Sequence, residues 1–130
     1  MKLLWIALGG GLGAVLRYLL GGALTARVEA HVPWGTVAVN VAGCFLIGLA
    51  SAWFLAQDPE REGLRLALVV GVLGGFTTFS TFAFETVALF RDGRAHAALA
   101  NVVLSNVGGV LACWVGFALF SRIFPAATSS

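Results

Sequence analysis

The chain has 130 residues, of which 59% are hydrophobic and only 11% are charged. A soluble domain of this length needs polar side chains over most of its surface, and eight Lys/Arg with six Asp/Glu are too few to supply them. The net charge of +2 is small and the basic residues are scattered, which argues against a nucleic-acid partner. Composition therefore indicates an integral membrane protein whose apolar surface faces the lipid bilayer.

Four apolar segments follow one another along the chain, at residues 3–24, 35–56, 64–90 and 97–120. Each is long enough to cross a hydrocarbon core of about 30 Å at about 1.5 Å per residue. Their continuous apolarity predicts helices, because the strands of a membrane barrel alternate apolar and polar residues. The sequence thus predicts an all-α membrane protein, with one four-helix transmembrane domain over residues 1–125 and a short tail over 126–130.

The first segment contains one basic residue, Arg17, about 21 Å along the expected helix. A basic side chain at this depth either snorkels to the interface or lines an aqueous vestibule. Lys2 precedes the apolar run, as in a signal peptide, but Arg17 and the glycine-rich stretch 9–13 make a poor export core. We therefore expect the segment to be retained as the first helix.

Basic residues are divided equally between the two sides that a four-span chain presents to water. The side that holds both termini carries Lys2, Arg61, Arg65 and Arg122, and the other carries Arg17, Arg27, Arg91 and Arg94. An excess of Lys/Arg normally sets the orientation of a membrane protein. Its absence predicts insertion in both orientations, and hence an antiparallel dimer. The alternative is an orientation set by a feature that this count does not capture.

The third segment concentrates glycine and hydroxyl residues. Gly74 and Gly75 are followed by four hydroxyl residues in five positions, Thr77, Thr78, Ser80 and Thr81. Paired glycines weaken a helix, and threonine side chains compete for its backbone hydrogen bonds. We therefore expect a break at Gly74–Thr78. Broken membrane helices often expose carbonyls to cations or N–H groups to anions, so a break here would indicate an ion site. The alternative is a continuous, glycine-packed helix.

Three phenylalanines, Phe76, Phe79 and Phe82, recur at every third position and are expected to share roughly one helix face. Such a stripe is usually packing, but Ser80 and Thr81 interleave with this one. An aromatic ring has a positive edge and a negative face. Ring edges can therefore favour an anion without carrying a formal charge.

Other polar residues lie within the apolar segments and should face protein or water rather than lipid. Asn40 is in the second segment, Ser105 and Asn106 are in the fourth, and Asn101 is nearer an end. Glu85, late in the third segment, is either a rim residue or a buried, proton-carrying acid. No cluster of His, Cys, Asp and Glu has ligand or catalytic spacing, so the sequence does not predict an enzyme.

Three sequence blocks resemble the small dual-topology fluoride channels of the Fluc or CrcB family. The most specific is Gly71-x-x-Gly74-Gly75-Phe76-Thr77-Thr78-Phe79-Ser80-Thr81-Phe82. The others are Gly9-Gly10-x-x-Gly13-Ala14-x-x-Arg17-Tyr18 and Gly35-Thr36-x-x-x-Asn40-x-x-Gly43. The resemblance extends from Gly9 to about Gly109, with the blocks in the expected order and helices.

This resemblance implies a fluoride-selective channel that passively exports cytoplasmic fluoride and relieves its toxicity, in the bacterial cytoplasmic (inner) membrane. It implies an antiparallel homodimer with two pores, and a structural sodium ion at the dimer centre held by the carbonyls of Gly74 and Thr77. Arg17 would belong to the vestibule, and Asn106 is the alternative to Ser105 on the fourth helix. The implied fluoride pathway comprises Asn40, Phe79, Ser80, Thr81, Phe82 and Ser105.

Two other functions remain as alternatives. A small dual-topology multidrug or cation exporter needs a membrane-embedded carboxylate, typically early in the chain, whereas Glu85 is the sole candidate here and comes late. A non-transporting scaffold subunit fits the glycine-rich packing. It would leave Asn40 and the hydroxyl residues of the third segment without a purpose.

Overall fold

A computed structural model describes residues 1–27, 31–56 and 59–125. The described chain is helical and contains no strand, and four of its helical stretches are long and apolar enough to cross a membrane. The prediction of an all-α chain with four membrane-spanning helices is therefore confirmed. The spans are α1 (Lys2–Thr25), α2 (Trp34–Leu55), a composite third span (Glu62–Arg91) and α6 (Ala95–Ile123).

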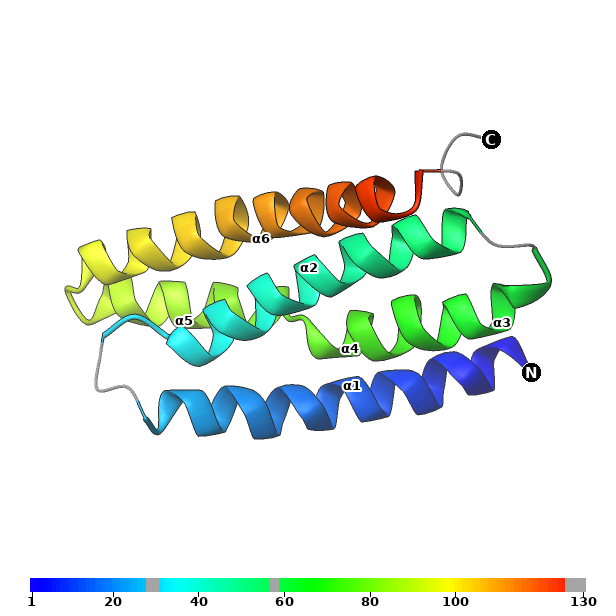
Figure 1. Ribbon diagram of the computed structural model, residues 1–130. Helices are drawn as coiled ribbons and strands as arrows, with labels where there is room; N and C mark the ends of the chain where they lie inside the picture. The colour runs from blue at the N-terminus through cyan, green and yellow to red at the C-terminus, as the bar shows by residue number, and fades with distance from the viewer. Residues whose placement is uncertain (28–30, 57–58, 126–130) are drawn as a thin grey trace.

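The spans lie side by side, and the start of α1 and the end of α6 are at the same end of the bundle (Figure 1). A short 3-10 turn, Pro59–Arg61, leads into the third span. That span is the irregular one, because it changes helix type and is then interrupted. In order it consists of α3 (Glu62–Arg65), a π-helical stretch η2 (Leu66–Leu73), α4 (Gly74–Phe76) and, after a break, α5 (Phe79–Arg91).

Glycines allow α1 to lie directly against the first half of the third span. A Cβ atom added to Gly9 would collide with the Ala67 carbonyl, and one added to Gly13 would collide with the Val72 carbonyl. Small residues permit such close approach between membrane helices. The position of η2 and α4, and hence of the break that follows, is thus fixed against the backbone of α1.

A second pair of glycines joins α2 to α6. A Cβ atom on Gly48 of α2 would collide with the Cys113 carbonyl of α6, and one on Gly116 of α6 would collide with the Phe45 carbonyl of α2. The two helices run together along much of their length (Figure 1). This contact joins α2 to α6, and α6 also packs directly against α5, the second half of the third span.

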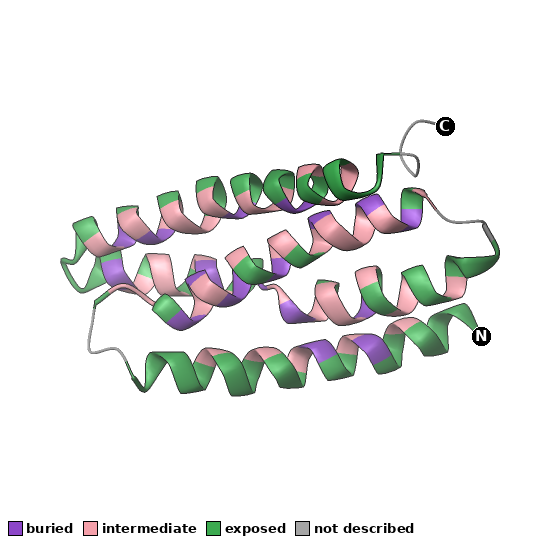
Figure 2. Cartoon of the chain, in the orientation of Figure 1, coloured by how far each residue is buried: buried purple, intermediate pink, exposed green. Residues whose placement is uncertain are grey.

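Much of the apolar surface remains exposed, most clearly on α1 (Figure 2). The buried residues of α1 are Gly9 and Gly13, whereas Leu8, Tyr18 and Leu19 are all exposed. Lipid, or a second protein subunit, is the favourable environment for such a surface. The small apolar core is formed by Val37, Val39, Ala52, Phe54, Phe76, Phe82, Leu89 and Ala98.

Candidate ion pathway

The third span is interrupted by two residues in extended conformation. Thr77 has φ −76° and ψ 155°, and Thr78 has φ −147° and ψ 120°. The break lies within the predicted stretch, but Gly74 and Gly75 themselves are helical. Gly75 is needed for packing, because a Cβ atom there would collide with the Gly10 carbonyl of α1. The glycines therefore bring α4 against α1, and the threonines form the break.

Asn40 of α2 supplies the acceptor that the Thr78 N–H loses at the break, and it also donates to the Thr78 carbonyl. The Thr78 N–H donates to Asn40 Oδ1 at 2.7 Å, and Asn40 Nδ2 donates to the Thr78 carbonyl at 2.9 Å. Both residues are buried. An unpaired backbone group is costly in an apolar environment. The side-chain amide thus takes the place of a peptide group and stabilises the extended conformation of Thr78.

The carbonyls of Gly74 and Thr77 are among those that lose their normal helical donors as a result. In a continuous α-helix the N–H of Thr78 would donate to the Gly74 carbonyl, and the N–H of Thr81 to the Thr77 carbonyl. Here the Thr78 N–H donates to Asn40, and the Thr81 N–H donates to Thr78 Oγ1 at 3.2 Å. The carbonyls of Gly74 and Thr77 are the pair that the family resemblance implies for a sodium ion.

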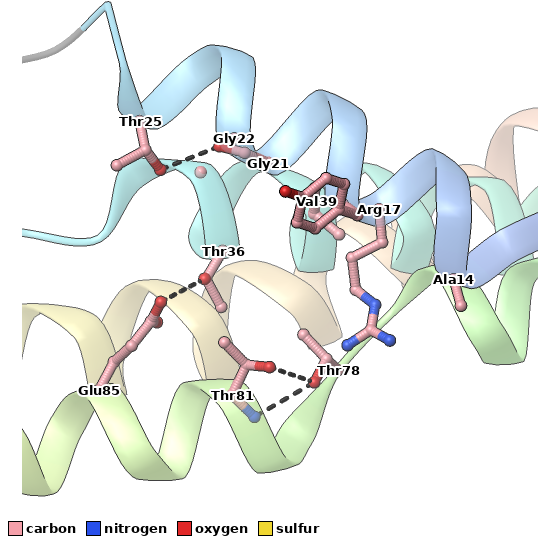
Figure 3. A pocket seen from close by; sticks show the side chains of 12 residues that line it. Ala14, Arg17, Gly21, Gly22, Thr25, Thr36, Val39, Thr78, Thr81 and Glu85 are labelled. Carbon is pink, nitrogen blue, oxygen red and sulfur yellow. Dashed lines mark hydrogen bonds between the residues drawn. The ribbon is translucent and has the colours of Figure 1, made fainter.

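The larger of two cavities near the break has a volume of about 350 Å³ and lies between α1, α2 and α5. Arg17 extends from α1 toward Thr78 at the break (Figure 3). The Arg17 Nε atom is buried and has no hydrogen-bond partner among the described residues. A buried donor on a positively charged group favours an anion or ordered water in this cavity. Its lining includes Ala14, Arg17, Gly21, Thr36, Val39, Thr78, Thr81 and Glu85.

Glu85 of α5 forms part of the same wall and is half-buried. Its Oε1 atom accepts a hydrogen bond from the Thr36 hydroxyl at 2.8 Å (Figure 3). Its Oε2 atom is buried and has no partner within the described part of the chain. The cavity therefore has a cationic group and an acidic group, each with one buried atom that has no partner among the described residues.

A smaller cavity of about 260 Å³ lies on the α6 side of the break. The rings of Phe79 and Phe82 meet there, with centroids 5.2 Å apart and planes inclined at 49°. Phe82 is 7% exposed, whereas Phe79 is 74% exposed. Thr78 lines both cavities, so it stands between them. The lining consists of Asn40, Cys44, Thr77, Thr78, Phe79, Phe82, Ser105, Asn106, Gly109 and Val110, none of which is charged.

The residues predicted for the pathway are thus divided between two cavities. The smaller contains four of them, and also Asn106, the alternative to Ser105 on α6. Thr81 joins the predicted vestibule residue Arg17 in the larger cavity. Ser80 is exposed, and its Oγ atom lies 3.4 Å from Thr78 Oγ1. The four in the smaller cavity are Asn40, Phe79, Phe82 and Ser105.

The expected stripe of three phenylalanines is interrupted. Phe76 belongs to α4, whereas Phe79 and Phe82 belong to α5, and the break separates the two helices. The Phe76 ring is buried where a Cβ atom on Gly43 would meet it. Phe76 is therefore a packing residue. Periodicity alone misplaces it because the helical phase is lost across Thr77 and Thr78.

A family model described as CrcB-like protein, Camphor Resistance (CrcB), matches residues 4–117. The chain belongs to this family. It is 52% identical over 122 residues to the fluoride-specific ion channel FluC of Solibacter usitatus, an alignment that covers 94% of this chain and all of the relative. The fluoride-specific ion channel FluC of Salinibacter ruber is 50% identical over 130 residues, which cover 98% of this chain and 96% of the relative. These CrcB relatives are ion channels and not enzymes, as the sequence predicted for this chain.

Sequence reasoning did not assign a role to Thr78, which proves central to this CrcB chain. Thr78 is the N-cap of α5, since its side chain accepts a hydrogen bond from the Thr81 N–H. Threonine is among the residues that favour this position. The sequence signal for this N-cap was a hydroxyl residue placed after a weakened helix and before a new apolar run. Thr36 gave no such signal, because its partner Glu85 is distant in the sequence.

Proposed function

We propose that the chain forms a fluoride-selective channel that carries fluoride passively out of the cytoplasm, across the bacterial inner membrane, and so relieves its toxicity. The observation that carries this proposal is the pair of cavities that share Thr78. One cavity contains the cationic Arg17, and the other has an uncharged lining with the Phe79–Phe82 pair. The fluoride-specific channels that resemble the chain support fluoride as the ion.

The chemistry of the smaller cavity suits a small, strongly hydrated anion. Such an ion needs donors that replace its water, and amide N–H groups, hydroxyls and aromatic ring edges provide them. Asn40 Nδ2 has a second N–H beyond the one given to Thr78. A fixed cation in a narrow path would bind the anion too tightly to release it. Arg17 avoids this problem because it lines the wider cavity, where it attracts anions.

The proposed channel is an antiparallel homodimer with two pores. Four spans enclose little space of their own, and much of the apolar surface next to the pathway is exposed. Phe79 is 74% exposed beside the break, and a second subunit would cover this ring. The equal division of Lys/Arg between the two sides supports opposite orientations of the two copies.

A sodium ion at the dimer centre is proposed as a structural component. The carbonyls of Gly74 and Thr77 lack their usual helical donors. The Thr78 N–H donates to Asn40 Oδ1 instead, and the Thr81 N–H donates to Thr78 Oγ1. Carbonyl oxygens are suitable ligands for hard cations. Two copies would offer four such oxygens, and the bound ion would supply attraction between the copies without entering either pathway.

Fluoride efflux from liposomes tests the proposed function. Purified protein is reconstituted in liposomes loaded with potassium fluoride, and efflux is followed with a fluoride electrode after valinomycin is added. We expect rapid fluoride efflux, and no chloride efflux from matched liposomes loaded with potassium chloride. Liposomes without protein measure the background leak of fluoride. The proposal is wrong if monodisperse protein carries no fluoride.

The multidrug or cation exporter retains one supporting observation, the half-buried Glu85 with an unpaired oxygen in a cavity. Proton-coupled exchange requires an acid of this kind. Efflux of a fluorescent cation that depends on an imposed pH gradient, and that Glu85→Gln abolishes, would favour the exporter over the channel.

A further inference from the structure

Asn101 is the most completely enclosed polar side chain of the described residues. It lies on α6, and its exposed fraction is 0%. It does not line the smaller cavity, although Ser105, one turn later on the same helix, does. A buried amide must have hydrogen-bond partners to offset its desolvation. The identity of those partners indicates what the residue does.

The partners of Asn101 converge on one backbone carbonyl of α5. Asn101 Nδ2 donates to Thr86 Oγ1 at 2.9 Å and lies 3.4 Å from the Phe82 carbonyl oxygen. The Thr86 hydroxyl donates to the same carbonyl at 2.8 Å. Asn101 Oδ1 accepts from the Ser105 hydroxyl at 3.3 Å. The network therefore links α6 to the backbone of the residue whose ring lies in the smaller cavity.

This link matters because α5 is separated from the preceding helix. The break at Thr77 and Thr78 means that α4 does not fix the direction or rotation of α5. Asn40 holds the first residue before α5 through the Thr78 backbone. Asn101 holds α5 again at Phe82 and Thr86. Two buried asparagines from different helices thus restrain the short helix at successive turns.

We infer that Asn101, through Thr86, is a positioning residue that sets the place of the Phe82 ring in the ion pathway. The inference rests on the proposed fluoride channel and deepens it. Asn101 does not touch the ion, because it is enclosed and lies outside the cavity lining. Its loss should allow α5 to rotate or shift, and the ring edge at Phe82 then meets the ion less favourably.

Single-channel recording in planar bilayers tests this role, because the current through one open channel does not depend on how much protein has folded. Asn101→Leu replaces the amide with an apolar group of similar size, and Thr86→Val removes one hydroxyl from the same network. We expect either change to reduce the fluoride current by about three- to twentyfold, the range that interhelical hydrogen bonds in membrane proteins span. Thr86→Ser keeps the hydroxyl and should restore most of the current.

A matched control removes a hydroxyl elsewhere on α6. Ser121 donates to the Phe117 carbonyl of its own helix at 3.1 Å, so Ser121→Ala should leave the current unchanged. The combined Asn101→Leu and Thr86→Val variant should lose little more than either single variant, because both act on one network. Multiplicative losses in the combined variant would overturn the inference.

The failure of this inference can be told from the failure of the proposed function. If the unaltered protein carries fluoride, and Thr86→Val carries the full current, then Asn101 and Thr86 do not position Phe82 and the channel function stands. If the unaltered protein carries no fluoride, the proposed function itself has failed. Should Asn101→Leu not yield folded protein, Thr86→Val and its serine counterpart decide the question.

Discussion

Substitution of Asn40 by leucine should destabilise the fold strongly, whereas the same change at an exposed asparagine should not. The Asn40 side chain makes two buried hydrogen bonds, of 2.7 Å and 2.9 Å, to the N–H and the carbonyl of Thr78. Asn40→Leu removes both and leaves the Thr78 N–H unpaired in an apolar setting, whereas the Thr78 carbonyl, at the N-cap of α5, still accepts the first bond of that helix. One unpaired buried donor costs about 1–3 kcal/mol.

Measurements on membrane proteins give a similar value. Interhelical side-chain hydrogen bonds contribute about 0.6 kcal/mol on average and up to about 1.7 kcal/mol. Two of them give about 1–3 kcal/mol. The two ranges agree, so we expect a loss of about 1–3 kcal/mol in the free energy of unfolding. This loss can be measured by tryptophan fluorescence during titration with sodium dodecyl sulfate.

Asn106→Leu is the matched control. Asn106 is exposed and donates to the Val102 carbonyl of its own helix at 2.8 Å, so its loss should cost no more than about 0.5 kcal/mol. Equal losses for the two variants would refute the reasoning, because Asn40 would then contribute no more than an exposed asparagine. The role assigned to it at the break would have to be abandoned.

Three further outcomes are expected. Phe82→Ile should reduce fluoride efflux by about tenfold and leave the size-exclusion profile unchanged, because an aromatic edge contact is worth up to about 1.5 kcal/mol. Undiminished efflux would contradict the place of Phe82 in the pathway. Gly116→Leu should lower the free energy of unfolding by about 1–3 kcal/mol, because the new side chain would collide with the Phe45 carbonyl. Gly11→Leu, with open space around it, should lower it far less. Similar losses would argue against close packing of α2 and α6. Glu85→Gln should retain measurable fluoride efflux because a passive channel needs no proton-carrying acid; complete loss in well-folded protein would favour proton coupling.

The four spans could be predicted from sequence because a continuously apolar segment as long as a bilayer is thick is typical of a membrane-spanning helix. The predicted limits lie within a few residues of the observed helices. The break was also predictable in position, though not in detail. The sequence predicted a break over Gly74–Thr78, and within that stretch the extended residues are Thr77 and Thr78, not the glycines. Gly75 is retained in a helix because α1 leaves no room for a side chain.

The partners of the polar residues could not be predicted in the same way. That Asn40 would meet Thr78, Thr36 would meet Glu85 and Asn101 would meet Thr86 depends on the rotation of each helix and on its neighbours. Sequence patterns identify the polar residues that should avoid lipid, but they do not identify the partners of those residues. The two cavities, and the place of Thr78 between them, follow from these pairings.

The hydrogen bonds between Asn40 and Thr78 also bear on how the protein is made. A third span alone in lipid would have to leave the N–H of Thr78 without a partner if it were broken there. The interruption is favourable only once α2 lies alongside and offers its amide. The break is therefore a property of the assembled bundle. The third span must be inserted in the membrane and docked against α2 before the pathway can exist.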